Sequence, residues 1–206
     1  MVHIMNMINI LLENPLIYSM WANPLNRQKR NMIQKILPEV NNSRVLDIGC
    51  GPASNTSLFL SSDYTGIDSN PYYIDKAKKI YPQKIFFVQD VTNLKLEKKS
   101  FDLIYINALL HHLNDDMIKT LMTNLYSLMS SDGKIVLLEP IIPHKNNQLQ
   151  TILMKLDRGD YYRSPDEYCQ LSTQTFYIEK KEIFPLKLYG ITGWLQLAML
   201  LGKKSL

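Results

Sequence analysis

Between Arg44 and Pro140, short apolar runs rich in β-branched and aromatic residues alternate with segments of helical spacing. The apolar runs are residues 44–49, 64–68, 84–90, 101–107 and 131–140. The segments of helical spacing are residues 53–62, 71–81 and 114–130. Strands that alternate with helices along a chain pack as parallel neighbours, so this rhythm predicts an α/β fold, a parallel sheet with helices on both faces.

The rhythm changes after Pro140. Residues 144–171 are polar, helical and aromatic in character, whereas residues 176–185 and 194–204 have the composition of two strands without a helix between them. Parallel neighbours need a long crossover connection, so two consecutive strands predict an antiparallel pair at the edge of the sheet.

Composition narrows the class of protein. The chain has 206 residues, 46% hydrophobic and 20% charged, which suits one globular domain. The formal charge is +4, but the lysines are scattered, which favours solvated faces over a nucleic-acid surface. The only two cysteines, Cys50 and Cys169, are far apart in sequence and predict neither a disulfide framework nor a metal site, so a reducing cytoplasm is the default location.

The N-terminal residues 1–15 are apolar but are interrupted by Asn6 and Asn9. They lack a basic leading region and a small-residue cleavage site, so they do not resemble a signal peptide. No window of 18 uncharged apolar residues occurs, so we expect no membrane-spanning helix. We expect a helix that packs on the domain, with a surface helix that touches a membrane or the substrate as the alternative.

The stretch Val45–Thr56, VLDIGCGPASNT, ends an apolar run on a carboxylate and then turns on two glycines. In an open parallel sheet, ligands bind beyond the carboxyl ends of the strands, where this loop lies. Gly49 and Gly51 allow a tight turn and close approach of the backbone to a ligand. Asp47 would repel the pyrophosphate of a dinucleotide, which disfavours a nicotinamide enzyme and favours a ligand that is cationic here, such as S-adenosylmethionine.

Two further acids end strands. Asp68 ends the second apolar run, where a carboxylate accepts hydrogen bonds from ribose hydroxyls, a position also found in nicotinamide dinucleotide sites. Asp90 ends the third run, where its carboxylate would accept from an adenine amino group while the Val91 amide meets the ring nitrogen. Asp90 is equally suited to be the N-cap of a helix that begins at Val91, in the stretch VTNL, and the two roles are compatible.

Five successive stretches, VLDIGCG, GIDSNPYYIDKAKK, FFVQDVTNL, FDLIYINALLHHL and LMSSDGKIVLLEP, resemble in order and spacing the motifs of class I S-adenosylmethionine-dependent methyltransferases. The resemblance covers about residues 44–140. It implies a Rossmann-like, seven-stranded, mostly parallel sheet with an antiparallel last strand. The cofactor contacts that it implies are Asp47, Gly49, Gly51, Asp68, Asp90, Val91 and Asn107. The chain departs from the family at Pro52-Ala53, where the family often has Thr-Gly.

The resemblance also organises the chain. We expect a single methyltransferase domain over residues 1–206 with four parts. These are an N-terminal helical segment (1–43), a cofactor-binding half (44–140), a substrate lid (141–173) and a terminal strand pair (174–206).

Candidate catalytic residues follow the fourth strand. A methyl group moves by in-line displacement, which depends mainly on positioning, and a general base is needed only for a protonated nucleophile. His111 and His112 lie near the expected methyl position and are candidates for that base. The alternative is structural, because one of the two rings packs or caps the next helix. We expect no metal site, because adjacent side chains point apart and no third ligand is near.

Candidate substrate residues lie between the fifth and sixth strands, where this family keeps substrate-binding insertions. Their aromatic and guanidinium groups suit an aromatic, sugar or carboxylate-bearing substrate, and they are Arg158, Tyr161, Tyr162 and Arg163. Gly159 is a candidate hinge, and Ser164 begins a capping box for the next helix. Within residues 146–171 we therefore expect a lid that determines acceptor specificity.

These patterns predict an enzyme that transfers a methyl group from S-adenosylmethionine to a small molecule, with oxygen as the favoured acceptor atom. No nucleic-acid partner is expected. One alternative is a lipid or membrane-associated substrate, which the apolar ends of the chain favour. The other is a non-catalytic module that only binds S-adenosylmethionine. The identity of the acceptor and the oligomeric state stay open at this point.

Overall fold

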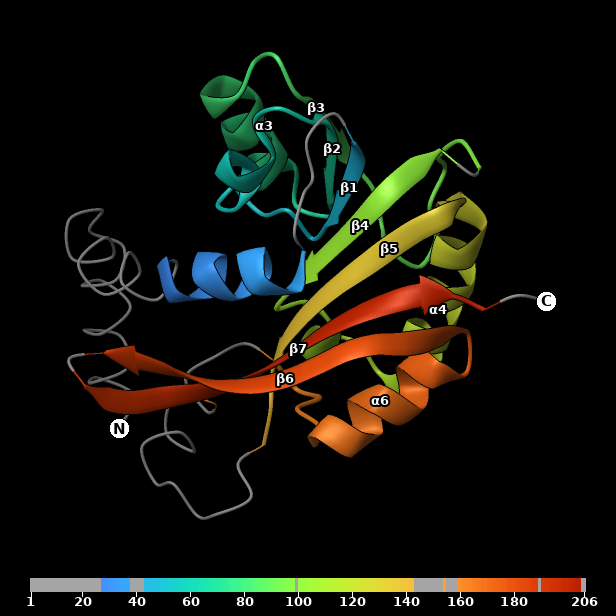
Figure 1. The fold of residues 1–206 in the computed structure, drawn as a ribbon. Coiled ribbons are helices and arrows are strands. Elements are labelled where there is room, and N and C mark those ends of the chain that lie inside the picture. The colour runs from blue at the N-terminus through green and yellow to red at the C-terminus, as the bar shows by residue number, and fades with distance from the viewer. Residues whose placement is uncertain are drawn as a thin grey trace.

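The computed structural model describes residues 27–37, 43–98, 100–142, 154, 159–188 and 190–204. The strands are β1 (Arg44–Ile48), β2 (Asp63–Asp68), β3 (Ile85–Val88), β4 (Phe101–Asn107), β5 (Met129–Pro140), β6 (Phe176–Leu188) and β7 (Ile191–Lys203). They form one seven-stranded sheet in the order β3-β2-β1-β4-β5-β7-β6 (Figure 1).

The direction of each strand agrees with the sequence prediction. The pairs β1–β2, β1–β4, β2–β3 and β4–β5 are parallel, whereas β7 runs antiparallel to both β5 and β6. The predicted antiparallel pair, β6 and β7, is at one edge of the sheet, with β6 outermost and β7 between β5 and β6. The strand order reverses between β1 and β4, which is where an open parallel sheet binds its ligands.

The helices are α3 (Pro71–Ile80), α4 (Asp115–Leu128) and α6 (Pro165–Thr173), with the short 3-10 turns η1 (Thr56–Phe59) and η2 (Leu110–His112). Asn70 and Asn114 cap α3 and α4 with side-chain oxygens, and Ser164 caps α6 in the predicted capping box. The expected helix over residues 53–62 is wrong in extent, because only η1 forms. Serine, asparagine and threonine recur there, and their side chains compete with the helical backbone for hydrogen bonds.

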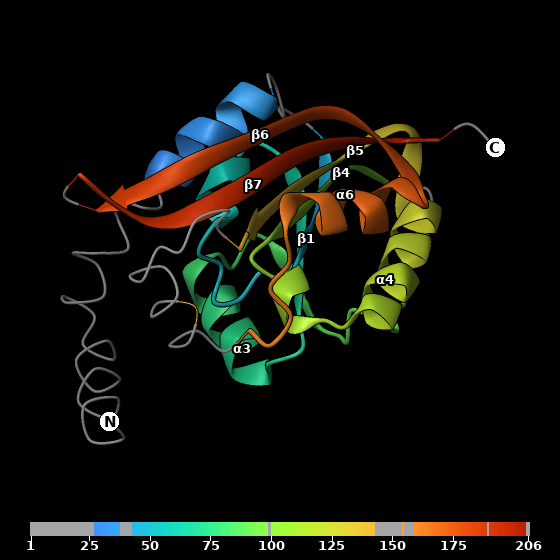
Figure 2. The ribbon, with the colours of Figure 1, turned by 90° about the horizontal axis from the view of Figure 1, so that it is seen from below.

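Buried side chains form one cluster on each face of the sheet. On one face α4 and α6 pack against the sheet, for example through Leu125 and Tyr168. On the other face lie η1, α3 and the helical residues 27–36, for example through Phe59, Ile74 and Ile36. Figure 2 shows α4 and α6 on the side of the sheet opposite to the helix of residues 27–36.

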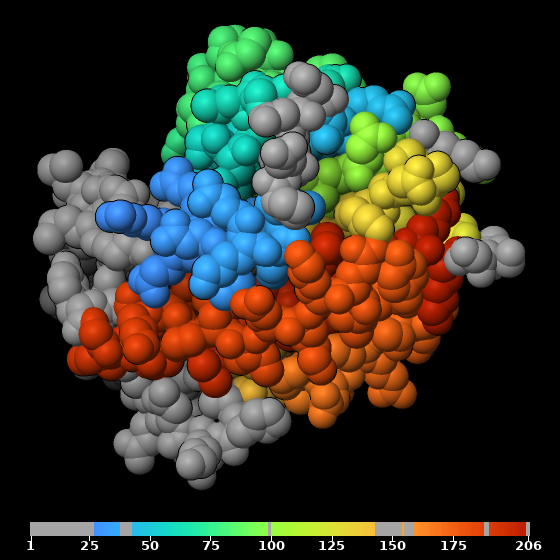
Figure 3. Space-filling model, viewed as in Figure 1, coloured from blue at the N-terminus to red at the C-terminus, as the bar shows by residue number. Residues whose placement is uncertain are grey.

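The β6–β7 hairpin extends beyond the rest of the sheet (Figure 1), and β6 contacts the helix of residues 27–36. The Gln28 side chain donates to the Lys187 carbonyl at 2.7 Å and accepts from the Lys187 amide at 2.9 Å. In Figure 3 the helix of residues 27–36 lies along β6. None of the helices among the described residues is long and apolar enough to cross a membrane. The helix expected over residues 1–15 lies outside the described residues.

Leu125 provides a test of the α4 face of the core. It is fully buried, whereas Thr123 on the same helix is exposed. We expect Leu125→Ala to lower the free energy of unfolding by about 2–5 kcal/mol because it leaves a cavity between α4 and the sheet. Urea unfolding followed by circular dichroism measures the change, and Thr123→Ala is the control, with an expected change within about 0.5 kcal/mol. Equal effects of the two substitutions would contradict this packing.

Candidate functional site

Asp47 lies inside the protein rather than open to the solvent. Its side chain is 2% exposed and accepts a hydrogen bond of 2.7 Å from the Tyr64 hydroxyl, which itself accepts one of 3.0 Å from the Thr56 hydroxyl. The pKa of Asp47 is raised to about 7, chiefly by burial and in a smaller part by the charge of Asp68, while the Tyr64 hydrogen bond opposes the shift. Burial beneath the glycine loop thus disfavours the charged form of this carboxyl group.

The glycine loop turns through three residues with positive φ: Gly49 (72°), Gly51 (54°) and Ala53 (67°). A Cβ at Gly49 would lie 3.0 Å from the Leu109 side chain, whereas a Cβ at Gly51 would meet nothing within 4 Å. The side of the loop at Gly51 is therefore open for a ligand. Ala53 adopts a conformation that favours glycine, which explains physically why the family often has glycine at this place.

Asp68 connects the glycine loop to the end of β2. Its two carboxylate oxygens accept from the Gly51 amide at 2.9 Å and from the Asn70 amide at 2.8 Å. Asp90, beyond β3, is exposed and accepts from the Thr92 amide and hydroxyl, and these hydrogen bonds lower its pKa. The capping role expected for Asp90 is thus present, in a turn rather than a helix.

Asn107 ends β4 beside the glycine loop. Its Oδ1 atom is buried and has no hydrogen-bond partner. The next residue, Ala108, has a φ of 53°, and its amide donates to the Leu138 carbonyl of β5 at 2.8 Å. The strained backbone of Ala108 directly follows the unpaired oxygen of Asn107. Strain and unpaired polar atoms cluster at ligand-binding sites, so this end of β4 is a candidate binding site.

Glu139, near the end of β5, holds the loop that follows β4. It is fully buried, and its Oε1 atom accepts from the amides of Leu109 and Leu110, each at 2.8 Å. Its Oε2 atom lies 2.9 Å from Nδ1 of His111, a side chain that is 1% exposed. A carboxylate oxygen accepts, so this contact places a proton on Nδ1. Three donors compensate the buried charge of Glu139.

Aromatic rings lie around His111. Its ring stacks on Tyr162 with 5.1 Å between centroids, and Tyr162 stacks on Trp194 of β7 at 6.4 Å. The exposed His112 ring lies 4.1 Å from that of His111. A Cβ at Gly159 would lie 2.2 Å from Cδ2 of His111, so this glycine permits close packing on the imidazole. Close packing explains Gly159 without the hinge expected from the sequence.

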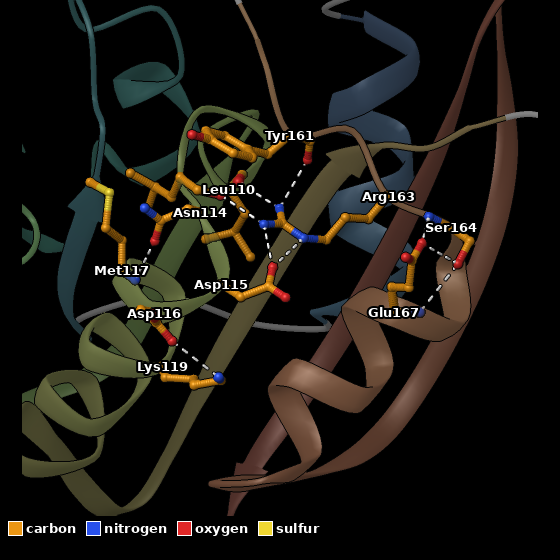
Figure 4. Close-up of polar contacts among 11 residues, drawn as sticks. Leu110, Asn114, Asp115, Asp116, Met117, Lys119, Tyr161, Arg163, Ser164 and Glu167 are labelled. Carbon is orange, nitrogen blue, oxygen red and sulfur yellow. Dashed lines mark hydrogen bonds and ion pairs between the residues drawn. The ribbon is translucent and has the colours of Figure 1, made fainter.

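Arg163 fastens the segment before α6 to the loop before α4 (Figure 4). Its guanidinium donates to the carbonyls of Leu110, Leu113 and Tyr161 at 2.8–3.1 Å and to Oδ1 of Asp115 at 2.7 and 3.0 Å. The residue is 6% exposed. Arg163 is therefore committed to structure. Tyr161, 43% exposed, is the member of the expected substrate group whose ring reaches the surface.

Comparison with known proteins adds to this geometry. Residues 45–133 match the family model described as a methyltransferase domain. Trans-aconitate 2-methyltransferases from Escherichia coli O7:K1 (strain IAI39 / ExPEC) and from Enterobacter sp. (strain 638) are 33% and 32% identical over 131 and 132 residues, which is 62% of this chain. The chain spans about half the length of the curated relatives it matches.

Solved structures share the fold. The N-methyltransferase NodS from Bradyrhizobium japonicum WM9, in complex with S-adenosylhomocysteine, has a TM-score of 0.74 at 15% identity over 97% of this chain and 98% of its own. The 1,6-didemethyltoxoflavin-N1-methyltransferase of Burkholderia thailandensis has a TM-score of 0.70 at 18% identity, over 97% and 86%. The chain shares the fold of these methyltransferases, and its residues 45–133 match a methyltransferase domain.

The residues predicted to bind the cofactor lie along one edge of the sheet. The carboxyl ends of β1, β2 and β4 are neighbours, which brings together Asp47, the glycine loop, Asp68 and Asn107. Asp90 and the buried Val91 follow β3 at the same edge.

The predicted catalytic and substrate residues, from the second half of the chain, differ in what the structure says of them. Arg158 and most of the expected lid (residues 143–153 and 155–158) lie outside the described residues. His111 is enclosed by Glu139, Gly159 and Tyr162, which disfavours its expected role as the catalytic base, whereas His112 is exposed.

Sequence reasoning missed Glu139. The signal was present, because Glu139 closes an apolar run just as Asp47 and Asp68 do. An acid at the end of a buried strand needs donors, and the amides of a loop on the neighbouring strand are the nearest source.

The buried Asp47 predicts a pH dependence of stability. Its pKa in the folded state, about 7, is above the unfolded value, so its favourable contribution is complete below about pH 4 and is lost as the pH rises through 7. Asp47→Asn keeps an oxygen acceptor for Tyr64 but never ionises. We expect the stability of Asp47→Asn relative to the wild type to increase by about 2–3 kcal/mol between pH 5 and pH 8. Urea unfolding at both pH values measures this difference, and a constant difference would refute it.

Glu139 provides the third test. Glu139→Ala leaves the His111 ring and two amides without their buried acceptor, so we expect a loss of about 2–5 kcal/mol in the free energy of unfolding. Glu139→Gln keeps one acceptor oxygen and should lose less. Glu182→Ala, at an exposed site on β6, is the control and should change stability by less than about 0.5 kcal/mol. If Glu139→Ala is as stable as this control, the loop after β4 is held by other contacts.

Proposed function

We propose that this protein is a methyltransferase that binds S-adenosylmethionine at the carboxyl edge of β1, β2 and β4 and methylates a small molecule, with oxygen as the favoured acceptor atom. The observation that carries the proposal is the unpartnered Asn107 Oδ1 atom beside the glycine loop. It suits an ammonium donor, which S-adenosylmethionine carries and a nicotinamide dinucleotide does not. The trans-aconitate relatives support a small-molecule acceptor.

Each part of the cofactor has a matching group in the chain. The open side of Gly51 lets the backbone approach the ligand, and the Asp68 carboxylate beside it accepts from ribose hydroxyls. The buried charge of Asp47 lies behind the loop, where it stabilises a cationic ligand through space rather than by contact. Asp90 and the Val91 amide, beyond β3, receive the adenine.

The chemistry requires mainly positioning from the protein. When bound, S-adenosylmethionine supplies a methyl group on a sulfonium sulfur, which leaves as a neutral thioether when an acceptor lone pair attacks the methyl carbon. The loop after β4, held by Glu139 and Arg163, fixes the wall on which the acceptor is oriented. His112 is the exposed base at this wall for a hydroxyl proton, and Tyr161 offers an exposed ring to the acceptor.

Calorimetry with S-adenosylmethionine, S-adenosylhomocysteine and NAD tests the proposal. We expect binding of the first two and none of NAD. We expect Asp68→Ala to raise the dissociation constant for S-adenosylmethionine at least about tenfold, because hydrogen bonds to a charged acceptor contribute about 1.5–3 kcal/mol each.

The matched control is Asp75→Ala, at an exposed acid on α3, which should leave the dissociation constant unchanged. Thermal melting of both variants verifies that they fold. Tight binding of NAD without binding of S-adenosylmethionine would overturn the proposal, and an unchanged dissociation constant in Asp68→Ala would show that Asp68 only holds the loop.

A further inference from the structure

Buried oxygen atoms without a partner gather on one face of the sheet. Among the described residues, four buried side-chain oxygens have no hydrogen-bond partner, and three of them belong to Tyr105, Asn107 and Gln196. Tyr105 is in the core cluster that faces η1 and α3. Asn107 lies two residues from Tyr105 on β4, and Gln196 lies two residues from Ala198 of that cluster on β7, so both share its face. Native proteins leave few such groups unpaired, so a cluster of them indicates a ligand that supplies the donors.

The strand register places Gln196 at the edge where the acceptor must lie. Gln196 pairs with Pro140, the last residue of β5, and Asn107 pairs with Leu138 of the same strand. Asn107 and Gln196 are therefore on the two sides of β5, close to its carboxyl end. Gln196 is 3% exposed, so its unpaired oxygen is held inside the protein. Trp194, two residues earlier on the same face of β7, stacks on Tyr162 and gives this region an aromatic wall.

The chemistry of these atoms selects the acceptor. The side-chain carbonyls of Asn107 and Gln196 only accept hydrogen bonds, so their partners must carry O–H or N–H groups. Arg163, the buried guanidinium of the described residues, is already bound to Asp115 and to backbone carbonyls. A fully ionised polycarboxylate carries no O–H or N–H group, so it would leave the buried oxygen of Gln196 unpaired.

We propose that Gln196 recognises a hydrogen-bond donor of the methyl acceptor, and that the acceptor is a neutral or cationic aromatic alcohol or amine rather than a polycarboxylate. This rests on the proposed function, with Asn107 assigned to the cofactor and Gln196 to the acceptor. The acceptor class thus differs from the substrate in the names of the trans-aconitate relatives, whose likeness to this chain covers about half of their length.

Methyl transfer to a defined panel tests the inference. The full chain and radiolabelled S-adenosylmethionine are incubated with catechol, tyramine, a hydroxyquinoline and trans-aconitate. We expect transfer to at least one aromatic alcohol or amine with a kcat/KM at least tenfold above that for trans-aconitate. Gln196→Met keeps the size of the side chain but removes its acceptor, so KM for the preferred compound should rise at least tenfold, while the dissociation constant of S-adenosylmethionine stays within twofold. Gln196→Glu keeps an acceptor oxygen and should lose less.

Gln170→Met, at an exposed glutamine of α6, is the matched control and should behave as the wild type. A preference for trans-aconitate, no transfer to any aromatic alcohol or amine of the panel, or an unchanged KM in Gln196→Met overturns the inference. If Gln196→Met does not fold, the wild-type panel decides. Absence of S-adenosylmethionine binding to the wild type in calorimetry is the separate failure of the proposed function.

Discussion

The buried carboxylate of Glu139 organises the half of the site that faces the acceptor. It joins the end of β5 to the loop after β4 through two amides and the His111 ring. His111 in turn supports Tyr162 and lies against Gly159, and Arg163 attaches the same segment to the loop from the other side. Because a buried charge with three donors tolerates little displacement, these contacts define one arrangement of the loop. The shape of this loop therefore depends on a carboxylate near the end of the neighbouring strand.

The fold of the predicted cofactor-binding half, residues 44–140, could be predicted from local sequence patterns. Strands, their direction and the glycine turn follow from apolar runs and from residues such as Gly49 and Gly51, whose conformational demands are local. The acids Asp47 and Asp68 were found because each ends a strand. Their partners were not found: Tyr64 is 17 residues from Asp47, and only the pairing of β1 with β2 brings the two together.

The acceptor half depends on contacts that a sequence pattern does not contain. Arg163 looked like a substrate residue because arginine beside tyrosines suits many ligands, but the fold surrounds it with a carboxylate and two carbonyls that are 48–53 residues away in sequence. Gly159 was predicted to be a hinge, and in the structure it packs closely against the His111 ring. The failed helix over residues 53–62 is the one local error, caused by the polar side chains that follow Ala53.

The contact between Gln28 and Lys187 joins residues 159 positions apart. During synthesis the helix of residues 27–36 leaves the ribosome long before the hairpin that it binds. The strand β7 must also insert between β5 and β6, so β5 has no partner on that side until β7 has been synthesised. Pairings so distant in sequence slow folding and leave a strand edge exposed meanwhile. Until β7 is in place, the apolar β5 edge is therefore the part of the sheet that is most open to pairing with another chain.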